Sequence, residues 1–302
     1  MCFAAPLAPA NAPLALPRMG EAGALDLAAE RQLGERIASQ VFRDPDYLDD
    51  PVLSDYLQAI WQPLLASARA RGDVAPELAE RFAWRLMLAR DPSVNAFALP
   101  GGYLGVHLGL VATVGTADEL ASVLAHELTH VSQRHISRLL DRQDKQGPLM
   151  VAAMVLGALA ASASKNADVV QAAVVGGQAV AAQTQLNFSR DMEREADRVG
   201  YNVMTGAGFN GTGFVAMFDK LQHASRLNDD GAFPYLRSHP LTTERMADMQ
   251  TRLALAPPPD VHATPLSVAP PVSAQHHALM AARARVMAEP SVARWRAWLA
   301  EA

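Results

Sequence analysis

Apolar residues recur at helical spacing in two stretches of the chain. The first stretch follows Thr116, and its apolar positions are Leu120, Val123, Leu124, Leu128 and Val131. The second follows Ser189, and its apolar positions are Met192, Ala196, Val199 and Val203. A period of three to four residues predicts two helices, each with one buried face. Thr116 is a good N-cap and Glu119 is its capping-box partner, so the first helix should begin there.

The chain ahead of the first helix predicts three strands, at residues 82–88, 94–99 and 103–111. The last two strands join at Pro100-Gly101-Gly102, which is a turn signal. We therefore expect an α+β fold that is mainly helical, in which a small antiparallel sheet packs against the helices.

The first predicted helix carries His126-Glu127-Leu128-Thr129-His130, a His-Glu-x-x-His motif. Residues four apart lie on one face of a helix, so both imidazoles can bind a single Zn²⁺. Glu127 lies beside them, where it can take a proton from a zinc-bound water. Polar groups buried in such a helix are costly unless they are paired, and a metal ion is the most economical partner.

A catalytic zinc usually takes three protein ligands, so a third ligand is expected elsewhere in the fold. On the second predicted helix Glu193 and Asp197 are four residues apart and share a face. Glu193 could bind the metal while Asp197 accepts the N–H of a ligating histidine. Glu195 points away from Glu193 and is a weaker candidate. The alternative is a solvated face of mixed charge, because arginines alternate with acidic residues here.

Taken together, these motifs resemble a known family. His126-Glu127-x-x-His130 followed by Glu193-x-Glu195-Ala196-Asp197 is similar to the zinc metallopeptidases (gluzincins) of the HtpX and CAAX-prenyl-protease family, and in particular to periplasmic BepA-type proteases. The segment from Asn95 to Tyr103 and the element Ser238-His239-Pro240 extend the resemblance, which covers residues 25–253. It implies a zincin-like fold, zinc ligation by His126, His130 and Glu193, Glu127 as catalytic base, and Asp197 as the residue that supports a ligand.

The resemblance also implies that His239 can approach the zinc as a regulatory ligand. A neutral imidazole in the fourth position would displace the attacking water and hold the enzyme latent. The alternative is that His239 caps or packs a loop ahead of a helix that starts near Pro240. Arg245 would either steady a carboxylate or stabilise the oxyanion of the transition state.

Substrate binding is predicted at the sheet. In zinc peptidases an edge strand commonly takes the substrate backbone by β-addition, and the candidate edge consists of Tyr103, Leu104, Gly105 and Val106. The histidines outside the motifs, including His107, His135 and His277, are assigned to structure or solvent.

Composition narrows the function classes. Hydrophobic residues make up 50% of the chain and charged residues 19%, which gives ample material for a core. The formal net charge is -5 and no basic patch stands out, so nucleic acid is not an expected partner. The single cysteine, Cys2, excludes an internal disulfide and a multi-thiolate zinc site.

We expect four segments along the chain. Residues 1–24 form an N-terminal tail or the remnant of a signal peptide, with Ala8-Pro9-Ala10 as its cleavage site. Residues 25–256 form the metallopeptidase domain. Residues 257–272 form a Pro-rich linker, and residues 273–302 form a helical tail that a proline splits into two helices.

Two apolar runs, at residues 149–163 and 169–182, bear on membrane contact. Each is shorter than the roughly 20 residues that cross a bilayer. We expect two small-residue helices that form a lid over the active site or rest on a membrane surface. The alternative is a helical hairpin that dips into the bilayer.

The sequence therefore predicts a zinc-dependent endopeptidase with one Zn²⁺ per chain. By the resemblance, it would hydrolyse unfolded or misassembled proteins in the periplasm, in contact with the outer-membrane assembly machinery. The alternative is a chaperone-like binding protein in which the zinc site is latent, and the occupant of the fourth coordination position separates the two. A CAAX-type protease of prenylated proteins is a further alternative, disfavoured by the lack of credible membrane spans.

Overall fold

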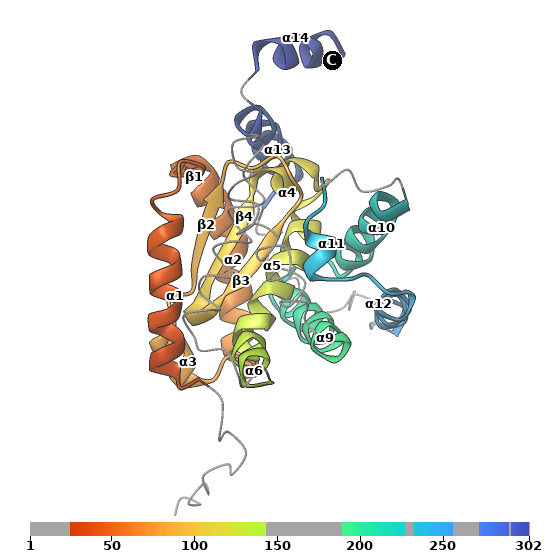
Figure 1. Cartoon of the computed structure of the whole chain (residues 1–302). Coiled ribbons are helices and arrows are strands. Elements are labelled where there is room, and N and C mark those ends of the chain that lie inside the picture. The colour runs from red at the N-terminus through yellow and green to blue at the C-terminus, as the bar shows by residue number, and fades with distance from the viewer. Residues whose placement is uncertain (1–24, 143–188, 227–231, 256–271, 290, 302) are drawn as a thin grey trace, which may run out of the picture.

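A four-stranded sheet lies at the centre of the protein, in a computed structural model that describes residues 25–142, 189–226, 232–255, 272–289 and 291–301. The strands stand in the order β1-β2-β4-β3 (Figure 1). Their bounds are Tyr47–Leu48 for β1, Arg85–Ala89 for β2, Ala96–Leu99 for β3 and Tyr103–His107 for β4. Strand β4 pairs in parallel with β2 and antiparallel with β3. The expected mainly helical α+β class with a small sheet is confirmed, but the sheet is mixed and not antiparallel as predicted, because β2 and β4 run in parallel.

Strand β4 is an interior strand, and all five of its residues are buried. The prediction that Tyr103, Leu104, Gly105 and Val106 form the edge of the sheet is therefore wrong. The physical reason is that β3 and the 3₁₀ turn η1 (Pro100–Gly102) serve as the crossover that returns β4 to the side of β2. Of the described strands, β3 is the outer one on this side of the sheet.

Strand β4 is also shorter than predicted, because Leu108–Thr113 forms the helix α4. Gly109 donates its backbone N–H to the Asp91 carbonyl at 2.9 Å. A Cβ at Gly109 would lie 2.0 Å from the Pro92 carbonyl oxygen, so only glycine permits this close approach. The contact turns the chain out of the strand and into the helix.

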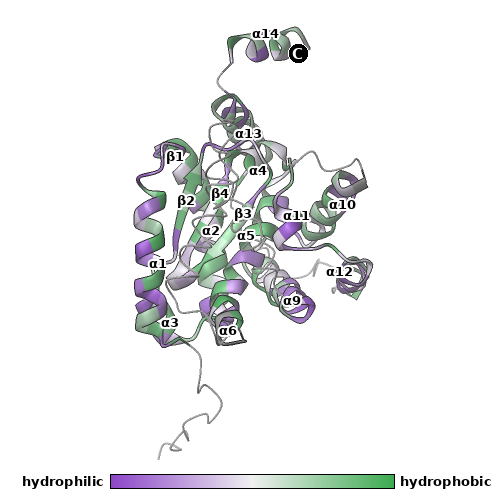
Figure 2. Ribbon diagram, in the orientation of Figure 1, coloured by the Kyte–Doolittle hydropathy of each residue, from purple (hydrophilic) through white to green (hydrophobic). Residues whose placement is uncertain are grey.

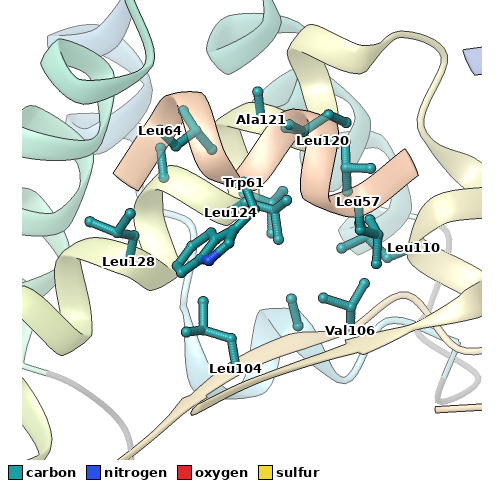
Figure 3. Close-up of a cluster of buried hydrophobic side chains, with 14 of the residues drawn as sticks. Leu57, Trp61, Leu64, Leu104, Val106, Leu110, Leu120, Ala121, Leu124 and Leu128 are labelled. Atoms are coloured by element: carbon teal, nitrogen blue, oxygen red, sulfur yellow. The ribbon is translucent and has the colours of Figure 1, made fainter. Parts of the chain in front are cut away.

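The two faces of the sheet are covered by different helices. Tyr103 packs with Leu33 and Ile37 of α1 (Leu27–Val41). The alternate positions on β4, Leu104 and Val106, face the other way, as the two-residue period of a strand requires. They join the main core, which α2 (Pro51–Arg71) and α5 (Ala117–Ser132) complete. Figure 3 shows this core, where Trp61 of α2 lies between Leu104 and the leucines of α5.

The remaining helices are α3 (Pro76–Arg81), α6 (His135–Arg142), α9 (Arg190–Gly206), α10 (Thr212–Arg226), α11 (Tyr235–Ser238), α12 (Thr243–Leu255), α13 (Ala274–Ala288) and α14 (Val292–Glu301). They lie around α5 and the sheet, except α14, which lies beyond α13 and apart from the others (Figure 1). Helix α9 packs along α5, and α10 packs on both α5 and α12. Figure 2 shows that α9 carries many hydrophilic residues, whereas the strands and α5 are largely apolar.

Helix α13 is joined to the main core. His277 is buried, its Nδ1 lies 2.6 Å from the Tyr56 hydroxyl, and Nε2 lies 3.1 Å from the Val114 carbonyl oxygen. Arg283 forms an ion pair with Asp50 at 2.6 Å. Because α13 buries Met280 against the core, the part of the tail that it forms is packed on the domain. Within the described residues of the tail the chain forms the helices α13 and α14.

None of the described helices is long and apolar enough to cross a membrane. The predictions for the tail at 1–24, the two apolar runs between 149 and 182, and residues 257–271 of the linker lie outside the described residues.

Candidate metal centre

Helix α5 places the His-Glu-x-x-His motif in the interior. The helix begins as predicted, because the Thr116 hydroxyl accepts the Glu119 backbone N–H at 3.1 Å. The Glu119 carboxylate in turn accepts the Gly115 N–H at 2.8 Å, so these two backbone N–H groups at the start of the helix both have hydrogen-bond partners. Every residue from Glu119 to Ser132 is buried. The polar side chains of the motif are therefore enclosed by protein.

Helix α9 brings carboxylates to the same place. Its N-cap is Ser189, which accepts the Met192 N–H at 3.3 Å. Glu193, Asp197 and Gly200 are spaced along one face of α9. At Gly200 a Cβ would lie 3.1 Å from the His126 backbone nitrogen, which is tighter than ordinary contact. The absence of a side chain there lets α9 approach α5 closely beside His126.

Four side chains meet between these helices: His126, His130, Glu193 and His239 are all buried, and one ligand atom from each lies within 4.8 Å of the others. His126 Nε2 lies 3.0 Å from His130 Nε2, 3.4 Å from His239 Nδ1 and 3.5 Å from Glu193 Oε2. Glu193 Oε1 lies 3.0 Å from His239 Nδ1 and 3.6 Å from His130 Nε2.

This arrangement fits a zinc ion. Ligand atoms about 2.0–2.1 Å from a tetrahedral Zn²⁺ stand about 3.3 Å from one another. Four separations among His126 Nε2, His130 Nε2, His239 Nδ1 and Glu193 Oε1 range from 3.0 to 3.6 Å, and three imidazoles with one carboxylate are donors that zinc accepts. The structure thus brings together the three residues predicted as ligands and adds His239 as a fourth donor.

Asp197 and Arg245 lie behind the ligand cluster. Asp197 Oδ1 is 3.0 Å from His126 Nδ1, the ring nitrogen that faces away from His130. Arg245 of α12 donates two hydrogen bonds to Asp197, at 2.6 and 2.8 Å, and its Nη1 lies 2.9 Å from Glu193 Oε2. Of the two roles considered for Arg245, its contacts are those of a residue that steadies carboxylates.

Burial and neighbouring charges shift the pKa values of the groups in this cluster. Burial lowers the pKa of His126, but the Asp197 and Glu193 carboxylates outweigh it and raise that pKa to about 9. Burial would raise the pKa of Asp197 and of Glu193. The Arg245 guanidinium nevertheless holds the pKa of Asp197 below its ordinary value, and the imidazoles of His239 and His126 lower that of Glu193.

Glu127 is fully buried, and its nearest polar neighbours are the ring of His239 and the side chain of Tyr235. Burial raises the pKa of Glu127, against the opposing effects of the His239 and His126 imidazoles and of a hydrogen bond from Tyr235. The His239 ring lies between this carboxylate and the ligand cluster, with Nε2 3.3 Å from Glu127 Oε1 and Nδ1 facing the cluster. A fully buried carboxylate whose neighbours in the described part of the chain include no arginine or lysine needs a functional explanation.

Two residues of the site were not identified from the sequence. His135, which was assigned to structure or solvent, is buried with its Nδ1 2.9 Å from His130 Nδ1. Tyr235 is buried beside the cluster, with its ring centroid 4.5 Å from that of His239 and 6.4 Å from that of His126. Helical spacing gives no signal for either residue, because His135 follows a break after α5 and Tyr235 lies on a distant short helix.

Residues 54–253 match the sequence model of Peptidase family M48, which is about two thirds of the chain. The chain belongs to peptidase family M48. It is 34% identical over 263 residues to a Vibrio cholerae protein provisionally named a beta-barrel assembly-enhancing protease, covering 85% of this chain and 52% of that protein. It is 31% identical to the Escherichia coli beta-barrel assembly-enhancing protease, covering 78% and 47% respectively.

A more distant M48 relative is the mitochondrial metalloendopeptidase OMA1 of Saccharomyces cerevisiae, at 26% identity over 68% of this chain and 57% of that protein. The chain spans about half the length of the curated relatives it matches. The two beta-barrel assembly-enhancing relatives agree with the resemblance that the motifs suggested.

Arg245→Ala should lower the free energy of unfolding by about 3–5 kcal/mol, because it leaves the buried Asp197 carboxylate without its cation. Arg252→Ala is the matched control on the same helix; its ion pair with Asp248 is partly exposed and should be worth under about 1 kcal/mol. Urea denaturation measures both variants. Equal losses in the two would show that the buried pair contributes no more than a surface pair.

Proposed function

We propose that this protein is a zinc-dependent endopeptidase. The observation that carries the proposal is Glu127, a fully buried carboxylate that lies outside the ligand set but next to it, 3.3 Å from a ring of the cluster of three imidazoles and a carboxylate. A purely structural zinc site has no use for such a group. A hydrolase needs it as the base that activates water. Membership of peptidase family M48 supports the same conclusion.

The proposed roles follow the geometry. His126, His130 and Glu193 would hold the zinc ion, which supplies a Lewis acid that acidifies water and polarises the scissile carbonyl. Glu127 takes the proton from the attacking water and later gives it to the leaving amine. Burial, which raises the pKa of Glu127, makes the carboxylate a stronger base than one in solvent. Asp197 accepts the Nδ1–H of His126 and so directs Nε2 of that ring toward the cluster.

Strand β3 is the proposed substrate-binding edge. The His107 N–H donates to the Asn95 carbonyl at 3.0 Å, and Ala96 stands opposite Val106 in the pairing with β4. Because backbone groups alternate in direction along an antiparallel strand, those of Ala96 and Ala98 point away from β4. Helix α5 packs against β3, so an extended peptide added there would run beside the motif helix. Backbone pairing depends little on side chains, which suits unfolded substrates.

The segment that carries His239 reaches the same edge. The Val94 N–H donates to the Ala232 carbonyl at 2.7 Å, and the Tyr235 N–H donates to the Val94 carbonyl at 3.3 Å. Val94 precedes β3 by two residues, and its backbone groups point in the same direction as those of Ala96. A substrate strand extended along β3 would therefore meet the segment that ends at His239.

His239 is the residue that we propose holds the active site closed. Its ring lies between the ligand cluster and Glu127, which is the place that an attacking water must occupy to reach its base. An imidazole there completes four protein donors, and a zinc site with four protein ligands is closed to catalysis. The same observation favours the second candidate function, a chaperone-like binding protein whose zinc site stays closed while the sheet edge holds unfolded clients.

The substrates and location are proposed from the relatives. Two of them are named for the assembly of beta-barrels. We therefore propose that the substrates are unfolded or misassembled envelope proteins, that the protein acts in the periplasm, and that its partners include the outer-membrane assembly machinery.

Glu127→Gln should keep its zinc and lose roughly 100- to 10,000-fold in peptide hydrolysis, because the amide cannot accept the water's proton. Zinc is measured by elemental mass spectrometry and cleavage with an unfolded protein substrate. Glu193→Ala is the comparison variant, and it should lose most of its zinc as well. If Glu127→Gln cleaved substrate at the wild-type rate, or if Glu193→Ala kept its full zinc content, the assigned roles would be refuted.

His239→Ala should cleave unfolded substrate faster than the wild type, since it frees the position in front of Glu127. The exposed His223 on α10 provides the control, and His223→Ala should leave the rate unchanged. An unchanged cleavage rate in His239→Ala would contradict the proposal that His239 holds the site closed. Binding of unfolded substrate by His239→Ala without cleavage, although zinc is retained, would support the chaperone-like alternative.

If the substrate pairs with β3 as an added strand, every second backbone N–H of the substrate should be needed for a hydrogen bond. In a series of peptides each N-methylated at one amide, methylation of alternate amides should lower kcat/KM by about 2- to 10-fold, the equivalent of one lost hydrogen bond. The intervening amides should tolerate the methyl group. A uniform effect along the peptide would contradict binding as an added strand.

A further inference from the structure

A chain of three side chains lies behind His130, on the side away from the ligand cluster. His130 Nδ1 is 2.9 Å from His135 Nδ1, and His135 Nε2 is 3.1 Å from Glu195 Oε2. Arg138 donates to the same Glu195 oxygen at 3.0 Å. His130 and His135 are fully buried, whereas the Glu195 side chain is 37% exposed. The chain thus runs from the candidate metal ligand to the protein surface.

Only one proton arrangement satisfies this chain if His130 offers Nε2 to a metal. A neutral imidazole has one N–H and one lone pair, so Nδ1 of His130 must carry the proton and donate it. His135 must then accept at Nδ1, which places its own proton on Nε2. That proton is donated to the Glu195 carboxylate. Each link fixes the next, and Glu195 defines the tautomer of both rings.

We propose that His135 and Glu195 are positioning residues that fix the tautomer and ring orientation of His130 for metal binding. This inference rests on the proposed function, because it needs His130 to be a ligand. With these roles, each of the two motif histidines has a carboxylate and an arginine behind it. His126 is backed directly by a carboxylate of α9, Asp197, and by Arg245. His130 is backed through His135 by another carboxylate of α9, Glu195, and by Arg138.

The backbone after α5 makes the contact attainable. In a continuous helix residue 135 would lie about 140° around the axis from residue 130, away from the metal face. The helix instead ends at Ser132, and Arg134 adopts φ 53°, in the left-handed region that non-glycine residues rarely occupy. Helix α6 then begins at His135 and returns its ring to His130.

Arg134 is held in this conformation by side-chain bonds. Its Nε donates to the buried carboxylate of Glu30 on α1 at 2.9 Å, and Nη2 donates to the Leu25 carbonyl and the Ser137 hydroxyl. A left-handed non-glycine residue costs about 1–3 kcal/mol and persists where the surroundings fix it. The fold thus maintains an unfavourable conformation at the residue that directs His135 toward His130.

The test compares two substitutions of His135 by zinc affinity, measured in competition with a chromophoric chelator. His135→Leu removes the acceptor, and its zinc affinity should fall roughly 10- to 100-fold, as is typical when the partner of a metal-bound histidine is lost. His135→Asn keeps an acceptor, since the amide oxygen stands near the position of Nδ1. It should retain affinity within about 3-fold of the wild type, because the hydrogen bond from His130 is preserved.

Two outcomes would overturn the inference. Wild-type affinity in His135→Leu would show that the contact does not support the ligand, and equal losses in Leu and Asn would show that His135 acts only by packing. Should His135→Leu fail to fold, Glu195→Leu replaces it, since Glu195 lies at the surface and its loss should also weaken zinc binding. If the wild type itself takes up no zinc, the proposed function fails; if it binds zinc and these variants do too, only this inference fails.

Discussion

The interaction between Asp197 and Arg245 supports the whole candidate site. Four imidazoles, from His126, His130, His135 and His239, lie with the carboxylates of Glu127, Glu193 and Asp197 in a largely apolar interior, where isolated charges are strongly disfavoured. Arg245 supplies the cation that pairs with Asp197 and lies 2.9 Å from Glu193. Because Asp197 also contacts His126, this one guanidinium links α12, α9 and α5. The positions of the histidine ring and of the Glu193 carboxylate both depend on it.

The helical part of the site could be predicted from the sequence because helical spacing fixes which residues share a face. His126 and His130 are four apart, as are Glu193 and Asp197, and the structure brings both pairs together. His239 lies far along the chain, and its place beside the cluster was suggested only by the resemblance to a family. The mainly helical class with a small sheet was likewise accessible from apolar spacing and from the turn at Pro100-Gly101-Gly102.

What the sequence did not reveal depends on contacts between distant segments or on a single backbone angle. Strand β4 is interior because it pairs with β2, which precedes it by a crossover, and the alternation within a strand does not indicate its neighbours. His135 reaches His130 because Arg134 adopts a positive φ, and arginine gives no local signal for that conformation. Tyr235 joins the site through its backbone hydrogen bond to the Val94 carbonyl, which is equally non-local.

The same non-local contacts bear on how a closed site could open. The segment from Ala232 to His239 is joined at one end to Val94, next to the outer strand, and at the other end to the ligand cluster and Glu127. A peptide paired with β3, as proposed, would contact the same short segment of chain that carries the His239 ring. Substrate binding at β3 would shift His239 from its position in front of Glu127 to an open position only if the peptide binds more tightly to the open form. The hydrogen bonds at Val94 are the contacts through which such a preference would arise, since a longer substrate strand would compete for them.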